Sequence, residues 1–313
     1  MGCAVPSTQL LQQLLPPIRR ARDCYLYTQD GRRIIDLYRC DGAALLGYRI
    51  ARIGRAEKQR LSEGVSAVLP SLYAARLQRA LAELLPSHPW VRLFGGIDAA
   101  QRALDRAGYG RPLDPAVGAD TPIPQGAGAG AATAVCRPFL PTPRCGVLLP
   151  RLPYPAAWAP QAVCFGADPG DALVSQAISP VALAGAVQAV AAWRAAERAR
   201  AGMAAAAGES AAAATGRRGR PPQRPQRVVP ELELERADCR GGVWLRRGPY
   251  LSTRLDDAGY RRLRRLFLQH DMLIAPQPGE PTVLPPSMSP GEFKLFAELS
   301  NICLVTQDVE SAE

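Results

Sequence analysis

The spacing of hydrophobic and polar positions along the 313-residue chain predicts short strands interspersed with amphipathic helices. The clearest strand signal is a hairpin, in which aromatic and β-branched residues of 24–27 and 33–38 flank the turn dipeptide Asp30-Gly31. Short apolar runs bounded by turn residues predict further strands at 91–94, 145–149, 161–165, 231–236, 242–246, 272–275 and 282–284. This alternation of strands and helices indicates an α/β protein.

Apolar residues that recur every three or four positions predict the helices. The predicted ranges are 57–85 with a break at residues 70 and 71, 99–107, 179–200, 256–270, and a last helix from residue 289. Ser71 and Asp98 are predicted N-caps, and residues 289–292 read as a capping box with proline at the first helical position. Near the N-terminus, the leucines of 10–15 form a narrow helical stripe that requires a partner surface.

Two stretches lack this periodicity. Residues 201–227 are dominated by Ala, Gly, Arg and Pro and cannot bury much apolar area, so we expect a mobile linker there. Residues 110–134 contain a G-x-G-x-x-A string at Gly126, Gly128 and Ala131. Prolines precede this string where a dinucleotide-binding fold needs a strand, so we do not interpret it as a nucleotide site.

Arginine supplies almost all of the positive charge. The formal net charge is +10, and Lys58 and Lys294 are the two lysines among 38 basic residues. Such a charge permits attraction to nucleic acid, but the arginines are scattered, and a nucleic-acid surface requires a basic stripe. The segment 217–227 is the exception, with five arginines and no aromatic residue that could stack on bases. We therefore expect a solvated linker and no nucleic-acid partner.

The eight cysteines show no C-x-x-C pair and no short repeated spacing, which argues against a zinc site or a disulfide framework. Cys136, Cys145 and Cys164 flank predicted strands without a histidine nearby in sequence, so we interpret them as buried structural thiols. His88 and His270 lie far apart, which argues against a multi-histidine metal site. No apolar run is long enough for a bilayer span and residues 1–20 do not resemble a secretory signal, so we expect a cytoplasmic protein without a membrane partner.

A strand at 91–94, the glycine pair Gly95-Gly96 and a helix from about residue 98 together form a strand-turn-helix unit. The backbone N–H groups at the start of such a helix can hold a phosphate. The alternative interpretation is an ordinary turn with an aspartate N-cap, and Asp98 would repel an anion.

The order of these elements resembles the class III pyridoxal-phosphate aminotransferases, in particular the glutamate-1-semialdehyde aminomutase branch. Residues 25–37 and 42–48 are similar to the family's N-terminal hairpin and the G-x-x-x-L-G-H segment that follows it. Residues 76–86 with 91–100 occupy the place of its phosphate turn, and residues 267–299 resemble its closing domain. The likeness covers about half of the chain.

The resemblance implies pyridoxal phosphate as cofactor, held at Gly95, Gly96, Ile97 and Asp98. In the family a hydroxyl-bearing residue stands where this chain has Ile97, and a glutamate stands where it has Asp98. The family also uses an aspartate on the pyridine nitrogen and a Schiff-base lysine, but residues 108–240 contain no lysine. Loop aspartates such as Asp120, Asp168 and Asp171 match the ring-nitrogen partner only by approximate position.

We therefore expect an α/β protein with a reduced aminotransferase-like (fold type I) large domain, built on a mixed or mainly parallel sheet, and a small C-terminal α+β domain. The predicted ranges are 1–40 for an N-terminal helix and hairpin packing on the small domain, 41–200 for the large domain, 201–228 for the linker and 229–313 for the small domain.

For function, we favour a shortened, catalytically inactive relative that acts as a structural or interaction partner. The first alternative is an active pyridoxal-phosphate-dependent aminotransferase or aminomutase with an altered site, and the second is a protein that binds nucleic acid through its basic linker. The resemblance implies a homodimer, or a heterodimer with a full-length aminotransferase relative, and the leucine stripe at 10–15 would suit such an interface.

Overall fold

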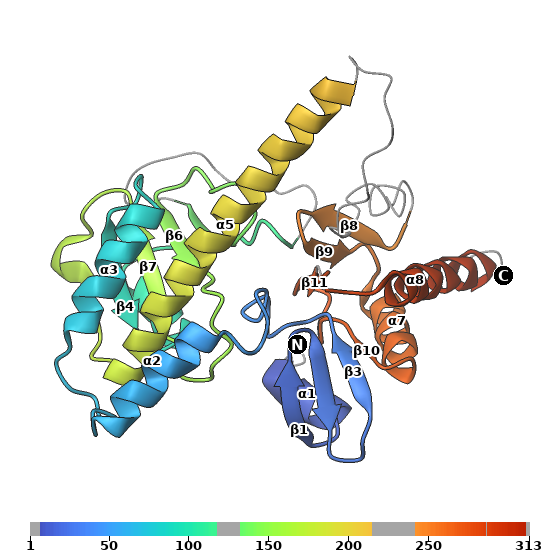
Figure 1. The fold of residues 1–313 in the computed structure, drawn as a ribbon, viewed down its shortest axis with the longest axis horizontal. Helices are drawn as coiled ribbons and strands as arrows, with labels where there is room; N and C mark the ends of the chain where they lie inside the picture. The colour runs from blue at the N-terminus through green and yellow to red at the C-terminus, as the bar shows by residue number, and fades with distance from the viewer. Residues whose placement is uncertain (1–6, 118–131, 215–241, 286, 311–313) are drawn as a thin grey trace.

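The computed structural model describes residues 7–117, 132–214, 242–285 and 287–310, and within them the chain forms two lobes (Figure 1). The large lobe contains a mixed sheet with the strand order β4-β7-β6-β5. Its strands are β4 (Trp90–Phe94), β5 (Thr133–Cys136), β6 (Val147–Pro150) and β7 (Gln161–Phe165). Because β7 runs antiparallel to both β4 and β6, whereas β5 is parallel to β6, the strands β4, β5 and β6 all point the same way.

Helices cover both faces of this sheet. One face packs against α2 (Ala51–Ser62), α3 (Leu72–Leu84) and α5 (Pro180–Ala214), and the other packs against α4 (Ile97–Arg106). Side chains alternate between the two faces along each strand, so that Leu148 joins the core under α3 and α5 while Val147 and Leu149 join the core under α4. Strands buried on both sides are expected to be apolar throughout, as β6 and β7 are.

The small lobe is built from both ends of the chain. The strands β1 (Ile18–Arg22), β2 (Tyr25–Thr28) and β3 (Arg33–Asp36) form one sheet with β10 (Met272–Leu273), which pairs parallel to β3. A second sheet has the order β11-β9-β8, from β8 (Trp244–Arg247), β9 (Tyr250–Thr253) and β11 (Thr282–Val283). The N-terminal hairpin therefore depends on a C-terminal strand for its place in the fold.

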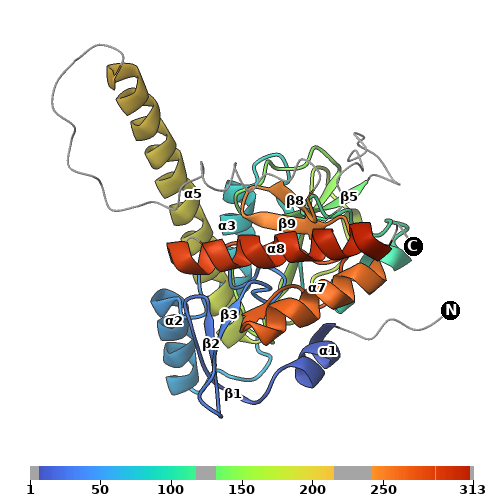
Figure 2. The same ribbon diagram turned by 90° about the vertical axis from the view of Figure 1, so that its right-hand side faces the viewer.

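The remaining helices are α1 (Ser7–Leu14), α7 (Asp257–Gln269) and α8 (Pro290–Glu310), and a short 3-10 turn lies at Gly170–Ala172. α7 and α8 lie side by side (Figure 2) and enclose a core in which Trp244, Phe267 and Phe296 contact one another at ring-centroid distances of 5.3–6.4 Å. Aromatic pairs at such distances contribute beyond the area they bury. Leu11 of α1 and Leu15, which directly follows α1, pack against the hairpin core, so part of the leucine stripe meets its partner surface within the chain.

Most predicted elements are confirmed, including two capping motifs. The Ser71 hydroxyl accepts a hydrogen bond from the N–H of Tyr73, and Ser289 and Glu292 each accept a bond from the other's backbone N–H. The predicted hairpin pairs Tyr25 with Ile35. The mixed α/β architecture with a smaller second unit is as expected, whereas the domain boundaries stay predictions.

Several details differ from the sequence prediction. The helical stretch predicted at 57–85 with a break at residues 70 and 71 forms two helices, α2 at Ala51–Ser62 and α3 at Leu72–Leu84, so the first helix begins earlier and the break is longer than predicted. The helix after the glycine turn begins at Ile97 with Gly96 as N-cap, so the assignment of Asp98 as N-cap was wrong. The strands β1, β5 and β9, each four or five residues long, were not predicted. Helix α5 continues through residues 201–214, which the prediction had placed in a linker, because alanine has the highest helix propensity.

Several predicted features lie outside the described residues. These are the basic run at 217–227 with the rest of the predicted linker beyond residue 214, the strand at 231–236, Asp120, and the glycine string at 126–131.

Two glycines of α5 provide a matched test of the packing. A Cβ at Gly185 would overlap with the Tyr154 hydroxyl, which donates a 2.5 Å hydrogen bond to Glu57, whereas a Cβ at Gly202 would meet nothing within 4 Å. We expect Gly185→Ala to lower the free energy of unfolding by about 1–3 kcal/mol through overpacking. We expect Gly202→Ala to raise it by about 0.5–1 kcal/mol through helix propensity. Urea unfolding of both variants measures this, and equal effects of the two substitutions would contradict the packing.

Candidate functional site

The glycine turn lies at the carboxyl end of β4, where α4 begins. The N–H of Gly95 donates a 3.0 Å hydrogen bond to Oε1 of Gln176, so the first donor of the turn already has a partner. Gly96 is the N-cap with extended backbone, Ile97 is 38% exposed, and Asp98 lies in the first turn of the helix. The turn thus keeps a helix N-terminus, but Ile97 brings no hydroxyl and Asp98 brings a negative charge to the same place.

Two arginines occupy the same edge of the sheet. Arg137 follows the last residue of β5, and Arg151 follows the last residue of β6. Since β4, β5 and β6 point the same way, their carboxyl ends meet at one edge, which is where open α/β sheets bind their ligands. The glycine turn and Arg137 lie three strand positions apart in the sheet order, which corresponds to about 14 Å.

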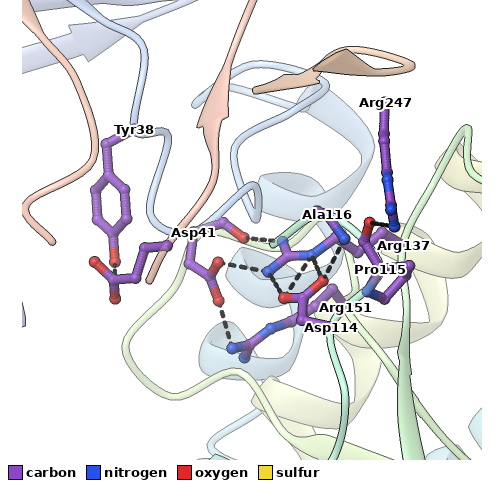
Figure 3. Close-up of polar contacts among 9 residues, drawn as sticks. Tyr38, Asp41, Asp114, Pro115, Ala116, Arg137, Arg151 and Arg247 are labelled. Atoms are coloured by element: carbon purple, nitrogen blue, oxygen red, sulfur yellow. Dashed lines mark hydrogen bonds and ion pairs between the residues drawn. The ribbon is translucent and has the colours of Figure 1, made fainter. Parts of the chain in front are cut away.

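Arg137 is the centre of a buried ion network, shown in Figure 3. Its side chain is 1% exposed, and its Nη2 lies 2.6 Å from Oδ1 of Asp41 and 2.5 Å from Oδ2 of Asp114. Its Nε donates to Asp114 at 2.8 Å, and its Nη1 donates to the backbone carbonyl of Asp41 at 2.7 Å. Arg151 forms an ion pair with the other oxygen of Asp41, Oδ2. Carboxylates thus accept from Nε and Nη2 of this buried guanidinium, and a backbone carbonyl accepts from Nη1.

An unusual backbone conformation presents Asp41 to these arginines. Arg39, Cys40 and Asp41 have φ values of 54°, 51° and 58°, and Gly42 follows with a φ of 81°, so four consecutive residues are left-handed. The left-handed conformation costs a non-glycine residue about 1–2 kcal/mol. Asp36 supports the turn, because its Oδ1 accepts hydrogen bonds from the N–H groups of Tyr38 and Arg39 at 2.9 Å.

Gly42 is needed at the end of this turn. A Cβ there would lie 3.1 Å from Nη1 of Arg137 and 3.2 Å from the Tyr250 ring, and the φ of 81° disfavours any side chain. The loop backbone therefore approaches both Arg137 and Tyr250 closely.

The small lobe reaches this cluster through its second sheet. The Tyr250 ring lies 5.4 Å from the Arg137 guanidinium in a cation–π contact, and Arg247 donates a 2.7 Å hydrogen bond to the carbonyl of Pro115, next to Asp114. The hydroxyl of Tyr38 donates to Oε1 of Glu280 at 3.2 Å. The network around Arg137 thus lies at the junction of the two lobes.

Burial and charge shift the pKa values of these groups in different directions. Burial raises the pKa of Glu280, and it would also raise the pKa of Asp114, but the hydrogen bonds and charge of Arg137 outweigh burial there and lower it. The carboxylates raise the pKa of Arg137 against the opposing effect of burial. Burial raises the pKa of Tyr250. The ionised forms of Arg137 and Asp114 therefore stabilise each other.

Four buried polar atoms have no hydrogen-bond partner among the described residues. They are Nε of Arg39, Nε of Arg151, the hydroxyl of Tyr250 and Oε2 of Glu280. The last three belong to the junction, because Arg151 and Glu280 lie close enough for their charges to influence each other and Tyr250 contacts Arg137. Buried polar groups without a partner are rare and each calls for an explanation.

The residues present do not fit a covalently held pyridoxal phosphate. Lys58 is exposed on α2, and Lys294 is 80% exposed on α8, where it pairs with Glu298 at 3.7 Å. The two helices lie in different lobes (Figure 1), and neither lysine belongs to the carboxyl edge of the large sheet. At that edge the charged groups are arginines that carboxylates already neutralise.

The other candidates have structural surroundings. Asp168 accepts from Arg92 at 3.2 Å on the surface, and Asp171 lies in the turn at 170–172. Burial raises the pKa of Cys136 to about 12 and that of Cys164 further, so neither is a ready nucleophile. His270 is the C-cap of α7.

Within the described residues, no group of three or more His, Cys, Asp or Glu side chains could hold a metal ion. In the same part of the chain, no helix has the length and apolar character needed to cross a bilayer.

The sequence reasoning missed Arg137, Arg151, Asp41 and Asp114, all of which the structure brings together. An Arg directly after a short apolar strand was the available signal for Arg137, but β5 itself was not predicted. Nothing local marked Asp41 or Asp114 as partners, because they lie 96 and 23 residues from Arg137 in the chain.

Comparison with known proteins finds a relative along nearly the whole chain. It is an uncharacterized protein of Treponema pallidum (strain Nichols), 31% identical over 316 residues and 95% of both chains. A glutamate-1-semialdehyde 2,1-aminomutase of Syntrophobacter fumaroxidans is 33% identical over 98 residues, which are 30% of this chain and 23% of the aminomutase. No protein-family model matches.

Among solved structures, the ornithine aminotransferase from Toxoplasma gondii superposes with a TM-score of 0.59 over 96% of this chain and 92% of the other, at 13% identity. Likeness at that identity shows the fold alone. The fold is that of the fold type I aminotransferases, with its mixed sheet and smaller second lobe.

The ion network can be tested through its pH dependence. At pH 7 we expect Arg137→Met to lower the free energy of unfolding by about 3–5 kcal/mol, because the largely buried carboxylate of Asp114 loses its ion-pair partner and Asp41 keeps only Arg151. In the wild type the lowered pKa of Asp114 gives stability that is present above its unfolded pKa and lost as the pH falls through the folded value. In the variant the carboxylates are protonated readily, so the difference between the proteins shrinks as the pH falls toward 4.

Urea unfolding between pH 4 and 8 measures this difference. Arg194→Met is the control, because Arg194 pairs with Glu83 at the surface and its loss is expected to cost no more than about 1 kcal/mol at any pH. A pH-independent effect of Arg137→Met would contradict the ionic role of Arg137.

Proposed function

We propose that this chain, which belongs to the same family as the uncharacterized Treponema pallidum protein and has the fold of the pyridoxal-phosphate-dependent aminotransferases, is an aminotransferase-related protein without lysine-dependent catalysis that acts by binding another protein chain. The partial similarity to a glutamate-1-semialdehyde aminomutase supports the aminotransferase relationship. That the chain is a shortened relative stays a prediction.

The observation that carries this proposal is the position of the two lysines. Schiff-base chemistry with pyridoxal phosphate needs a lysine beside the bound cofactor. Lys58 and Lys294 are the two lysines of the chain, and both are exposed on helices away from the carboxyl edge of the large sheet. No other residue type can form the same aldimine through a side-chain amine.

The phosphate turn gives further support. In this chain Gly95 bonds to Gln176, and Asp98 lies in the first turn of the helix that would receive the phosphate dianion. Ile97 offers no hydroxyl where the family has a hydroxyl-bearing residue, so one hydrogen bond to a phosphate is missing at this helix N-terminus. The cofactor would thus lose affinity at its phosphate as well as its covalent link.

An exposed apolar segment supports the binding role. Leu61, Val68, Leu69 and Leu72 are 48–59% exposed, and they lie at the end of α2, in the following loop and at the start of α3. Apolar side chains gathered this way on the surface mark interaction sites more often than isolated ones do. The neighbouring charges of Arg60 and Glu63 form a pair with each other.

We propose that a second copy of the chain covers this segment. In a two-fold dimer each patch faces itself, so an unpaired charge near the axis would repel its own copy. The segment avoids this, because its apolar residues are flanked by the neutral pair of Arg60 and Glu63. A heterodimer with a full-length aminotransferase relative is the alternative.

Cofactor trapping tests the absence of lysine-dependent chemistry. The purified protein is incubated with stoichiometric pyridoxal phosphate and reduced with borohydride. We expect no covalent adduct that disappears when one particular lysine is substituted. Mass spectrometry of the wild type and of the Lys58→Ala and Lys294→Ala variants measures this. A stoichiometric adduct lost in one variant alone would support the active-enzyme alternative instead.

Oligomeric state tests the interface. We expect the wild type to sediment as a dimer and the Leu69→Glu variant to sediment as a monomer with unchanged circular dichroism, because an exposed leucine contributes little to the fold of one chain. Ile18→Glu, at a 39% exposed position on β1 in the small lobe, is the control and should stay dimeric. A monomeric wild type, or a Leu69→Glu dimer, would refute this interface.

A further inference from the structure

Helix α7 lies on the outside of the small lobe (Figure 2) and carries an arginine face formed by Arg261, Arg264 and Arg265. We infer that this arginine face binds a short acidic segment of a partner protein, whose carboxylates pair with Arg261 and Arg265. The proposed dimer segment lies in the large lobe, at the end of α2 and the start of α3 (Figure 1). The arginine face is therefore a second surface, and the inference does not rest on the proposed function.

The amphipathic pattern of α7 places these arginines on its outer side. The residues that join the small-lobe core are Tyr260, Leu263 and Phe267. Arg261 and Arg265 lie between and beside these positions and are exposed. Side chains four residues apart on a helix are neighbours, with Cβ atoms about 5–6 Å apart. The two exposed guanidinium groups thus belong to one face of the helix.

The positive charges of this face act on one another. Arg264 is half-buried, and its Nη1 donates a hydrogen bond to the carbonyl of Pro276. Burial lowers the pKa of Arg264, and the charges of Arg261 and Arg265 lower it further. Like charges four residues apart destabilise a helix. The stability of α7 therefore does not account for the pair of Arg261 and Arg265.

Neither exposed arginine has an acidic partner of its own. Within the part of the chain that the structure describes, no carboxylate forms an ion pair with Arg261 or Arg265. The hairpin differs, because its exposed Arg32 lies 2.6 Å from Oδ1 of Asp271. A partner that brings carboxylates to α7 would relieve the repulsion and provide the missing counter-charges.

Carboxylates also limit the length of this positive surface. Asp257 is exposed one helical turn before Arg261, and Asp271 directly follows the C-cap of α7. At 1.5 Å per residue, Arg261 and Arg265 span about 6 Å along the helix axis. A long polyanion that followed α7 would meet a carboxylate at either end. A short segment with two carboxylates about 6 Å apart fits between them, as glutamates four positions apart on a helix do.

Two features favour an acidic protein segment over a nucleic acid. The aromatic residues of α7, Tyr260 and Phe267, are buried, so the helix offers no ring on which a base can stack. Nucleic-acid affinity also depends on the number of phosphates that are neutralised, and a face of this size reaches few of them. A carboxylate, in contrast, accepts two parallel hydrogen bonds from one guanidinium, so two glutamates satisfy the two exposed arginines.

Two matched peptides test the inference. One is a labelled, alanine-based helical peptide with two glutamates four positions apart, and the other has glutamines in their place. By fluorescence anisotropy at low ionic strength, we expect the full chain to bind the glutamate peptide saturably and at least tenfold tighter than the glutamine peptide. Added salt should weaken this binding, because the charges are exposed. No saturable binding, or equal affinity for the two peptides, would overturn the inference.

Two double variants of equal charge locate the binding surface. We expect Arg261→Gln with Arg265→Gln to weaken binding of the glutamate peptide at least fivefold, with unchanged circular dichroism because both side chains are exposed. Arg102→Gln with Arg106→Gln is the matched control. These two arginines are also exposed and four residues apart, but α4 carries aspartates as well, and affinity should stay unchanged. Equal affinities of the two double variants would refute the arginine face. If the α7 double variant fails to fold, Arg265→Gln alone is expected to weaken binding.

A short DNA duplex tests the nucleic-acid alternative. We expect the duplex to bind the wild type and the α7 double variant equally. Duplex binding that is tighter than that of the glutamate peptide, and that the α7 double variant loses, would overturn the inference in favour of a nucleic acid. The Leu69→Glu variant should bind the glutamate peptide as the wild type does, so failure of the proposed dimer and failure of the arginine face are separate results.

Discussion

The buried charge of Arg137 is the constraint on which the arrangement of this molecule depends. A guanidinium that is 1% exposed must be neutralised, and the chain does so with Asp41 from the N-terminal loop and Asp114 from the large lobe. To bring Asp41 within 2.6 Å, four consecutive residues adopt the left-handed conformation, and Gly42 must lack a side chain. The Tyr250 ring of the small lobe packs against the same guanidinium, so the charged side chain of Arg137 contacts both lobes.

This network occupies the edge of the sheet at which an α/β fold offers its binding site. The parallel strands β5 and β6 place Arg137 and Arg151 at this edge, where carboxylates form ion pairs with both guanidinium groups. The aminotransferase fold is kept at 13% identity to an ornithine aminotransferase, because packing and topology tolerate extensive substitution. A reaction depends on particular side chains, so a shared fold does not by itself imply that the same chemistry takes place at this edge of the sheet.

Much of the local structure was predictable from the sequence, because it depends on neighbours along the chain. The hairpin around Asp30-Gly31, the Ser71 cap and the capping box at Ser289 and Glu292 follow from turn chemistry and side-chain bonds over two or three residues. The α/β architecture follows from the periodicity of the apolar positions. The predicted start of α4 was two residues too late, because the N-cap is Gly96 and not Asp98.

By itself the sequence determined which residues form these elements, that two lysines are the whole supply of amine side chains, and that cysteines and histidines form no recognisable metal motif. Only the tertiary structure decided that both lysines are exposed, that β10 completes the N-terminal sheet, and that Asp41 meets Arg137 across 96 residues of chain. The physical reason is range. Caps and turns are local interactions between neighbours in the chain. The partner that neutralises a buried charge depends instead on which distant segments the tertiary packing brings close.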